Sequence, residues 1–190
     1  MKMMQMSNDI KENYKISIVN GDILNAPETY IVHQCNCTTL TSAGLAKSIN
    51  KKYPWADIYS TRKKQGTFRE NIVSLTTPDI PGTIKIQSNP FKTKHVICMF
   101  AQYSPGKINY NTTSKKISPT KFADTSYNRS KWFTQCLDAI AKELPFIKTF
   151  AFPYKIGCGL AGGDWELYLK HLSNFARLYK RNVIIYKLEN

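Results

Sequence analysis

A glycine-rich segment near the C-terminal end constrains the fold of this chain more than any other feature. Four glycines fall within residues 157–163, between a short apolar run at 149–153 and a helical pattern that begins near Asp164. The spacing Gly157-x-Gly159-x-x-Gly162 satisfies the dinucleotide fingerprint, yet only 28 residues follow Gly162. One helix and one strand use all of these residues, so the further strands of a Rossmann site do not fit.

The same segment also indicates chemistry. Glycines allow backbone amides to approach a phosphate closely, and the positive end of a helix beginning near Asp164 would attract an anion. A loop that only turns a corner is the alternative, but four glycines are more than a turn needs. We therefore predict a phosphate-binding loop at this position.

Strand-like and helix-like patterns alternate along the whole chain. The patterns predict strands at 15–19, 30–35, 71–76, 83–87, 94–102, 149–153 and 182–188. They predict helical segments at 43–53, 55–64, 132–144 and 164–179, and a long loop at 103–123. Such alternation is typical of an α/β fold, with helices on both faces of a mostly parallel sheet.

Length and composition limit the class of protein. The chain has 190 residues, enough for one domain and too few for two sizeable ones. We expect a flexible segment at 1–13, followed by a single monomeric domain at 14–190. The longest apolar run, residues 96–101, is too short to span a membrane, and the N-terminus lacks a signal-peptide pattern. Five cysteines, an odd number in mostly apolar surroundings, favour free thiols in a reducing, cytoplasmic compartment.

The charge is strongly positive and unevenly distributed. The formal net charge is +14, and residues 61–122 contribute +9 of it. Basic loops attract many polyanions, from a nucleotide to a nucleic acid. The charge therefore points to an anionic partner without selecting one.

A second loop, Thr41 to Ala46, also joins a predicted strand to a helix N-terminus. Two such loops at the carboxyl ends of two strands describe a crevice for a ligand with a diphosphate. The sequence contains no Gly-x-x-x-x-Gly-Lys-Ser/Thr pattern, which excludes a P-loop NTPase.

Several polar residues at strand ends are candidates for function. Asp22 follows Asn-Gly and is explained equally well by turn chemistry. Asn36 ends an apolar strand, where an amide needs hydrogen-bond partners. His33 is in phase with Cys35 and Cys37, and is either a core histidine or a catalytic one. No second closely spaced Cys/His pair exists, so we expect no metal and no cofactor.

Taken together, these segments resemble the macrodomain family. The resemblance covers roughly residues 15–188, in family order. It is carried by Gly21-Asp22-Ile23-Leu24, Ile31-Val32-His33-Gln34-Cys35-Asn36-Cys37, Ala43-Gly44-Leu45-Ala46 and Pro153-Tyr154-Lys155-Ile156-Gly157-Cys158-Gly159-Leu160-Ala161-Gly162-Gly163-Asp164-Trp165. The chain looks closest to the branch with the yeast ADP-ribose-1''-phosphate phosphatase and the ADP-ribosyl-glutamate hydrolase macrodomains.

The resemblance implies a three-layer α/β/α sandwich that binds ADP-ribose at the carboxyl end of a mixed, mostly parallel sheet. Asp22 would accept a hydrogen bond from adenine, with Gly21 and Ile23 beside it. Asn36 would contact the distal ribose, which Gln102 and Tyr103 could flank. The diphosphate and distal ribose would lie between two loops, consisting of Ala43, Gly44, Leu45, Ala46 and of Ile156, Gly157, Cys158, Gly159, Leu160, Ala161, Gly162.

The resemblance also implies hydrolysis at the distal ribose. Candidate catalytic residues are His33, Asn36 and Asp164, although Asp164 is explained equally well as an N-cap. The chain departs from the family in two places. Thr41, Ser42 and Ala43 stand where many relatives have a glycine run, and Ala161 stands where the glutamate hydrolases have a catalytic Asp. Their nucleophilic lysine has no clear counterpart among Lys115, Lys116 and Lys121.

Three functions follow as alternatives. The first is hydrolysis of ADP-ribose-1''-phosphate, or of ADP-ribose attached to protein or nucleic acid. The second is a non-catalytic reader of ADP-ribose, because a fold alone does not establish activity. The third is a basic nucleic-acid-binding module, although no base-reading or stacking motif of a known module is present.

Overall fold

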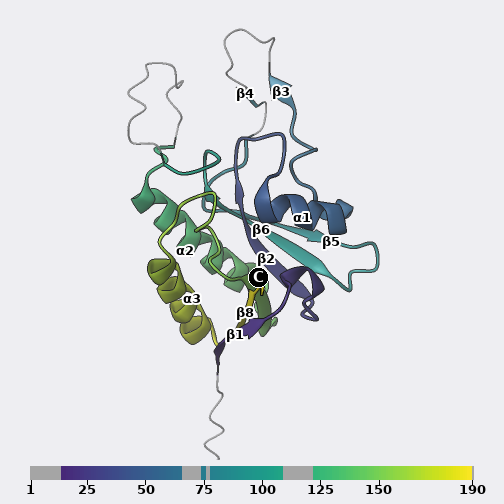
Figure 1. Cartoon of the computed structure of the whole chain (residues 1–190), viewed down its shortest axis with the longest axis vertical. Coiled ribbons are helices and arrows are strands. Elements are labelled where there is room, and N and C mark those ends of the chain that lie inside the picture. The colour runs from purple at the N-terminus through teal and green to yellow at the C-terminus, as the bar shows by residue number, and fades with distance from the viewer. Residues whose placement is uncertain (1–13, 66–73, 76–77, 109–121, 190) are drawn as a thin grey trace, which may run out of the picture.

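The computed structural model describes residues 14–65, 74–75, 78–108 and 122–189 (Figure 1). The segment predicted to be flexible, residues 1–13, lies outside the described residues. The same holds for most of the predicted strand at 71–76 and for residues 109–121 of the predicted long loop, with Lys115, Lys116 and Lys121.

A six-stranded sheet forms the centre of the molecule. Its order is β1 (Ile16–Asn20), β8 (Asn182–Lys187), β7 (Thr149–Pro153), β2 (Tyr30–Asn36), β6 (His95–Gln102) and β5 (Ile84–Ser88). All neighbours are parallel except β5 and β6, which are antiparallel. The predicted mixed, mostly parallel sheet is therefore confirmed. A small antiparallel pair, β3 (Lys64–Gln65) and β4 (Ser74–Leu75), lies apart from it.

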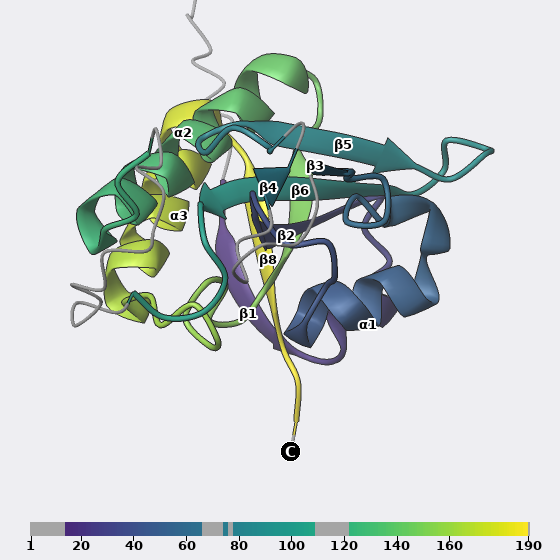
Figure 2. The ribbon, with the colours of Figure 1, turned by 90° about the horizontal axis from the view of Figure 1, so that it is seen from above.

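Helices cover both faces of the sheet (Figure 2). Helices α2 (Ser126–Glu143) and α3 (Trp165–Tyr179) lie on one face, and α1 (Gly44–Lys52) lies on the other. Alternate residues of β2 supply the two cores, because side chains alternate across a strand. Val32 packs in the cluster of α2 and α3, whereas Ile31 and Cys35 pack in the cluster of α1. The arrangement is the three-layer α/β/α sandwich that the resemblance implied.

Local hydrogen bonds explain where the predicted helices differ from the observed ones. The helical segment predicted at 55–64 is wrong, since only a 3-10 turn forms, at Pro54–Ala56. The Asp57 carboxylate accepts hydrogen bonds from the amides of Tyr59 and Ser60, which gives the backbone an alternative to a helix. Helix α2 begins earlier than its apolar stripe, because Thr125 caps a polar first turn.

Within the part of the chain that the structure describes, no helix combines the length and the apolar character that a membrane crossing requires.

Candidate functional site

A cavity of about 330 Å³ lies at the edge of the sheet where β2, β6 and β7 end. Most of the predicted site residues line it: His33, Asn36, Ala43, Gly44, Leu45, Ala46, Gln102, Ile156, Gly157, Gly159, Leu160 and Ala161. The other lining residues were not predicted as site residues: Gln34, Tyr59, Pro105, Gly106, Pro153, Tyr154 and Lys155. The size is that of a small-molecule site.

The remaining predicted residues do not line this cavity: Gly21, Asp22, Ile23, Tyr103, Cys158, Gly162 and Asp164. Asp22 lies at the same edge of the sheet, directly after β1, where its Oδ1 accepts a 2.9 Å hydrogen bond from the Leu24 amide. Tyr103 acts through its backbone, because its carbonyl accepts a hydrogen bond from the Cys37 amide at 3.0 Å. An adenine contact for Asp22 stays a prediction.

The helix N-terminus that faces the cavity belongs to α1. Its first residues, Gly44 to Ala46, line the cavity, and Ala43 at the N-cap offers no side-chain acceptor. The first turn holds no acidic residue either. The start of α1 thus lies at the cavity with no side chain capping its amides, an arrangement that favours anion binding.

Helix α3 differs, and here the prediction needs correction. The Asp164 carboxylate accepts hydrogen bonds from the amides of Glu166 at 3.0 Å and Leu167 at 3.4 Å. Asp164 is exposed and lies off the cavity lining, so the structure favours the N-cap interpretation over a catalytic acid or base. The expectation that α3 adds its positive end to the site is not met, because its own cap occupies that end.

Asn36 organises the loop that leads into α1. Its Oδ1 accepts three hydrogen bonds, from the amides of Thr38 at 3.1 Å and Thr39 at 2.9 Å and from the Thr39 hydroxyl at 2.9 Å. The carbonyl oxygen is therefore occupied inside the protein. Because Asn36 also lines the cavity, its amide nitrogen is the group that it can present to a ligand.

A buried ion pair supports the same loop from behind. Arg62 donates to Asp79 at 2.6 Å, and its two terminal nitrogens each donate to a backbone carbonyl, that of Thr39 or that of Asn36, both at 2.6 Å. Lys85 also pairs with Asp79, at 2.6 Å. The guanidinium thus fixes the loop through its backbone.

The glycine-rich loop is shaped by close contacts at three of its four glycines. A Cβ on Gly157 (φ +71°) would collide with Gln34 Oε1 and would lie 2.7 Å from the Tyr168 ring. A Cβ on Gly162 (φ +69°) would meet the Lys107 side chain at 2.7 Å, and one on Gly163 would meet the Gly157 carbonyl at 2.7 Å. A Cβ on Gly159 would meet no atom of the described residues within 4 Å.

The two loops meet at the mouth of the cavity. A Cβ on Gly44 would lie 3.2 Å from Leu160 Cδ1, so the Leu160 side chain reaches from the glycine-rich loop to the start of α1. Leu160 is 66% exposed, which is unusual for a leucine in such a position. The contact places the α1 amides and the glycine-rich loop within reach of one ligand.

Two glutamines join the ends of β2 and β6. Gln34 Nε2 donates to Gln102 Oε1 at 2.7 Å, and Gln102 Nε2 donates to the Ser104 carbonyl at 3.1 Å. A carbonyl oxygen only accepts hydrogen bonds, so this series of bonds fixes the orientation of both side-chain amides. Gln34 Oε1, below Gly157, is buried and has no hydrogen-bond partner within the described part of the chain.

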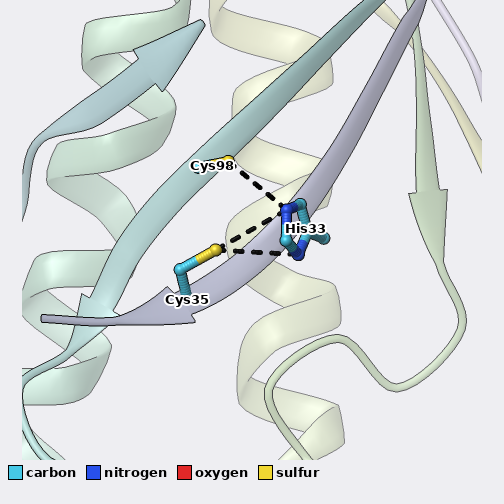
Figure 3. A group of neighbouring side chains, drawn as sticks. All are labelled: His33, Cys35 and Cys98. Carbon is cyan, nitrogen blue, oxygen red and sulfur yellow. Dashed lines mark hydrogen bonds between the residues drawn. The ribbon is translucent and has the colours of Figure 1, made fainter. Parts of the chain in front are cut away.

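His33 lies deep in the cavity lining and is only 1% exposed. Cys35 Sγ lies 3.6 Å from both ring nitrogens, and Cys98 Sγ from the neighbouring strand lies 3.4 Å from Nε2 (Figure 3). The possible ligand atoms of the three residues lie within 4.8 Å of one another. A sulfur equidistant from both nitrogens, however, is off the lone-pair direction of each, so these side chains as oriented do not converge on one ion.

The two thiols beside His33 have pKa values that move in opposite directions. Burial disfavours the Cys35 thiolate, but hydrogen bonding with Cys98 and the electrostatic influence of His33 lower the pKa of Cys35 well below its ordinary value. A hydrogen bond with Cys35, together with burial, raises the pKa of the Cys98 thiol. Burial raises the pKa of Cys158 to about 11, and burial likewise raises the pKa of Tyr59. Cys35 is 1% exposed and does not line the cavity, so its thiol is not placed to attack a ligand bound there.

Charge in the cavity favours an anion. Among the described residues, the lining includes Lys155 and no carboxylate. Lys107, packed over Gly162, adds a second cation beside the glycine-rich loop. Together with the amides of α1, these groups form a site that attracts negative charge.

Comparison with known proteins adds the fold family. No protein-family model and no curated protein matches the chain. Among solved structures, the macrodomain of Mycobacterium tuberculosis DarG is similar, with 20% identity, a TM-score of 0.56 and coverage of 90% of this chain and 97% of that one. The macrodomain of Thermus aquaticus DarG has 15% identity and a TM-score of 0.59, covering 91% and 98%. The Trypanosoma brucei macrodomain in complex with ADP-ribose has 9% identity and a TM-score of 0.56, covering 91% and 63%.

These likenesses establish that the chain has the macrodomain fold. At such identities they show the fold alone, so the branch inside the family stays a prediction.

Proposed function

We propose that the cavity binds ADP-ribose or an ADP-ribose derivative. The observation that carries the proposal is the uncapped start of α1, Gly44 to Ala46, facing a cavity that Lys155 lines and no described carboxylate does. A diphosphate bound there receives backbone hydrogen bonds and the positive end of the helix. The Trypanosoma macrodomain of the same fold is described in complex with ADP-ribose, which supports this choice of ligand.

In this proposal the diphosphate lies between the start of α1 and the glycine-rich loop. The distal ribose lies against Asn36, whose amide nitrogen donates to a hydroxyl. The adenine lies toward Asp22, at the carboxyl end of β1. The ligand thus follows the edge of the sheet from β1 to β2 and β6, where open α/β sheets bind their ligands.

We further propose that the protein hydrolyses a bond at the distal ribose, in ADP-ribose-1''-phosphate or in ADP-ribose attached to a macromolecule. His33 is the imidazole of the described lining. In this mechanism His33 accepts a proton from the attacking water, while Asn36 positions the ribose. The leaving group departs with the bonding electron pair and takes up a proton.

A reader function is the alternative, and one observation favours it. His33 is 1% exposed, Asp164 is occupied as an N-cap, and Ala161 carries no acid. A site without an accessible acid or base binds its ligand and releases it unchanged.

Calorimetric titration with ADP-ribose tests binding. Gly159→Glu places a carboxylate in open space at the cavity and should abolish binding by charge repulsion, whereas Gly159→Ala should bind like the wild type. Failure of the wild type to bind millimolar ADP-ribose would refute the proposed ligand. Binding by Gly159→Glu at wild-type affinity would refute its placement.

Release of phosphate from ADP-ribose-1''-phosphate, or of ADP-ribose from conjugates, then divides enzyme from reader. We expect His33→Ala to lose turnover. His95→Ala is the matched control, because His95 begins β6 and bonds Ser88 Oγ, away from the cavity. No turnover by the wild type with any conjugate would leave the reader function, and equal turnover by His33→Ala would remove His33 from the mechanism.

A further inference from the structure

A second buried arginine, Arg129 of α2, lies behind the cavity and is only 3% exposed. Asp124 holds its guanidinium on one edge, through Nε at 2.6 Å and Nη2 at 2.7 Å. This two-point pair orients the planar group and compensates its charge. The rest of the guanidinium is then available for other acceptors.

The remaining donors bind backbone carbonyls of two separate segments. Nη1 donates to Gly106 at 2.8 Å and to Ala161 at 3.1 Å, and Nη2 donates to Ser104 at 3.2 Å. Gly106 and Ala161 both line the cavity. A single side chain therefore joins the segment that follows β6 to the glycine-rich loop.

The hydrogen bonds of Arg129 continue to two glutamines that line the cavity. The Ser104 carbonyl that accepts from Arg129 also accepts from Gln102 Nε2, and Gln102 accepts from Gln34. The Ser104 amide donates to Asp124 at 2.8 Å. Arg129 thus belongs to one hydrogen-bond network with both glutamines, and Gln34 lies next to Gly157.

The glycine-rich loop needs such an anchor. Between Gly157 and Gly163 its own backbone bonds are short-range: Gly162 to Gly159 at 3.1 Å and Gly163 to Gly157 at 2.9 Å. Glycines lose more conformational freedom on ordering than other residues, so a loop rich in them is costly to fix at the moment of binding. An anchor that fixes the loop beforehand raises affinity by removing that cost.

We propose that Arg129 is a positioning residue that holds the cavity-lining face of the glycine-rich loop in its binding conformation through the Ala161 carbonyl. For its ligand this inference rests on the proposed function. Its structural part, the fixing of the loop, is independent of any ligand.

Two variants of Arg129 separate positioning from charge compensation. Arg129→Lys keeps a cation beside Asp124 but lacks the planar fork, so it cannot reproduce all the carbonyl contacts. We expect amide exchange at Gly162 and Gly163 to rise by about tenfold or more, with the melting temperature little changed. We expect ADP-ribose binding to weaken by about tenfold, as for the loss of one charge-assisted hydrogen bond. Arg129→Met removes the cation as well and should also lower the melting temperature.

Arg62→Lys is the matched control, since Arg62 is an equally buried arginine paired with an aspartate under the other loop. Its effect on exchange should fall at Thr38 and Thr39, whose amides bind Asn36, and not at Gly162 and Gly163. Asp124→Asn weakens the ion pair with Arg129. Amide exchange should therefore rise at the same residues as in Arg129→Lys, but by a smaller factor.

The outcomes are separable. Wild-type exchange at Gly162 and Gly163 in Arg129→Lys would overturn the proposal, and so would an even rise over the whole chain, which indicates general support of the fold. A wild-type protein that does not bind ADP-ribose contradicts the proposed function alone, because the exchange comparison still decides the role of Arg129.

Discussion

The two loops that line the cavity are held by different means. The loop from Asn36 to Ala46 is built on side chains, with three hydrogen bonds to Asn36 Oδ1 and a buried arginine against its backbone. The loop from Tyr154 to Asp164 is built on glycine conformations and close packing, with Arg129 contacting it at Ala161. The first loop is therefore fixed by side-chain hydrogen bonds, whereas the second depends on the absence of side chains at its glycines and on the contact of Arg129 with Ala161.

Removing the charged side chain of Arg62, which supports the first loop, should have the largest effect on the free energy of unfolding. Arg62→Met leaves Asp79, which is 7% exposed, with Lys85 as its remaining ion-pair partner among the described residues. We expect the free energy of unfolding to fall by about 3–5 kcal/mol, as for other buried pairs that lose one member. Urea denaturation measures it, and a decrease below about 1 kcal/mol would show that Lys85 alone compensates Asp79.

In the second loop, we expect substitution by Ala to lower the free energy of unfolding at Gly157 and to leave it nearly unchanged at Gly159. Gly157→Ala forces a methyl group against Gln34 and Tyr168 at a positive φ, and we expect a loss of about 2–4 kcal/mol in unfolding free energy. Gly159→Ala meets nothing and should change it by less than about 0.5 kcal/mol. Equal effects of the two substitutions, measured by thermal denaturation, would contradict the packing described for this loop.

We expect Asn36 to stabilise the protein through its side-chain oxygen. Asn36→Ala removes the acceptor of three hydrogen bonds and should lower the unfolding free energy by about 1–3 kcal/mol. Asn36→Asp keeps the acceptor and should retain most of that stability, yet lose ADP-ribose affinity because it replaces the ligand-facing donor with a charged oxygen. If both variants were equally unstable, the loop would not depend on this acceptor.

The smallest expected effect is a difference in the rate of alkylation between one cysteine of each loop. Cys158 is half-buried with a pKa raised to about 11, whereas Cys37 is fully buried. Alkylation of Cys158 by iodoacetamide should be slow at pH 8 and should accelerate about tenfold per pH unit up to pH 10, because the thiolate is the nucleophile. Mass spectrometry locates the product, and modification of Cys37 before Cys158 would reverse the proposed order of exposure.

The sequence allowed the fold and both cavity loops to be predicted because their signals are local. Gly157 to Gly163 stand between a strand and a helix, and the Thr41 to Ala46 loop stands in the same context. Parallel strands bring their carboxyl ends to one edge, so these loops had to meet. The capping role of Asp164 was foreseen for the same reason, since an N-cap depends on neighbouring residues.

What could not be predicted depends on partners far apart in the chain. Gln34 and Gln102 meet only through the pairing of β2 with β6, and Cys98 reaches His33 by the same pairing. Arg129 reaches Ala161 because α2 lies beside the glycine-rich loop. The start of α3 was expected to contribute to the site together with that of α1, because a sequence shows where a helix begins but not where its first turn is directed.

The central claim is that α1, with the glycine-rich loop, presents backbone amides to the diphosphate of ADP-ribose. Titration of the ¹⁵N-labelled protein with ADP-ribose, followed by amide chemical shifts, tests it most directly. We expect the largest shifts at Gly44, Leu45 and Ala46 and from Gly157 to Ala161, with little change at Glu166 and Leu167, whose amides Asp164 already binds. The absence of shifts at millimolar ligand, or shifts centred on the start of α3, would contradict it.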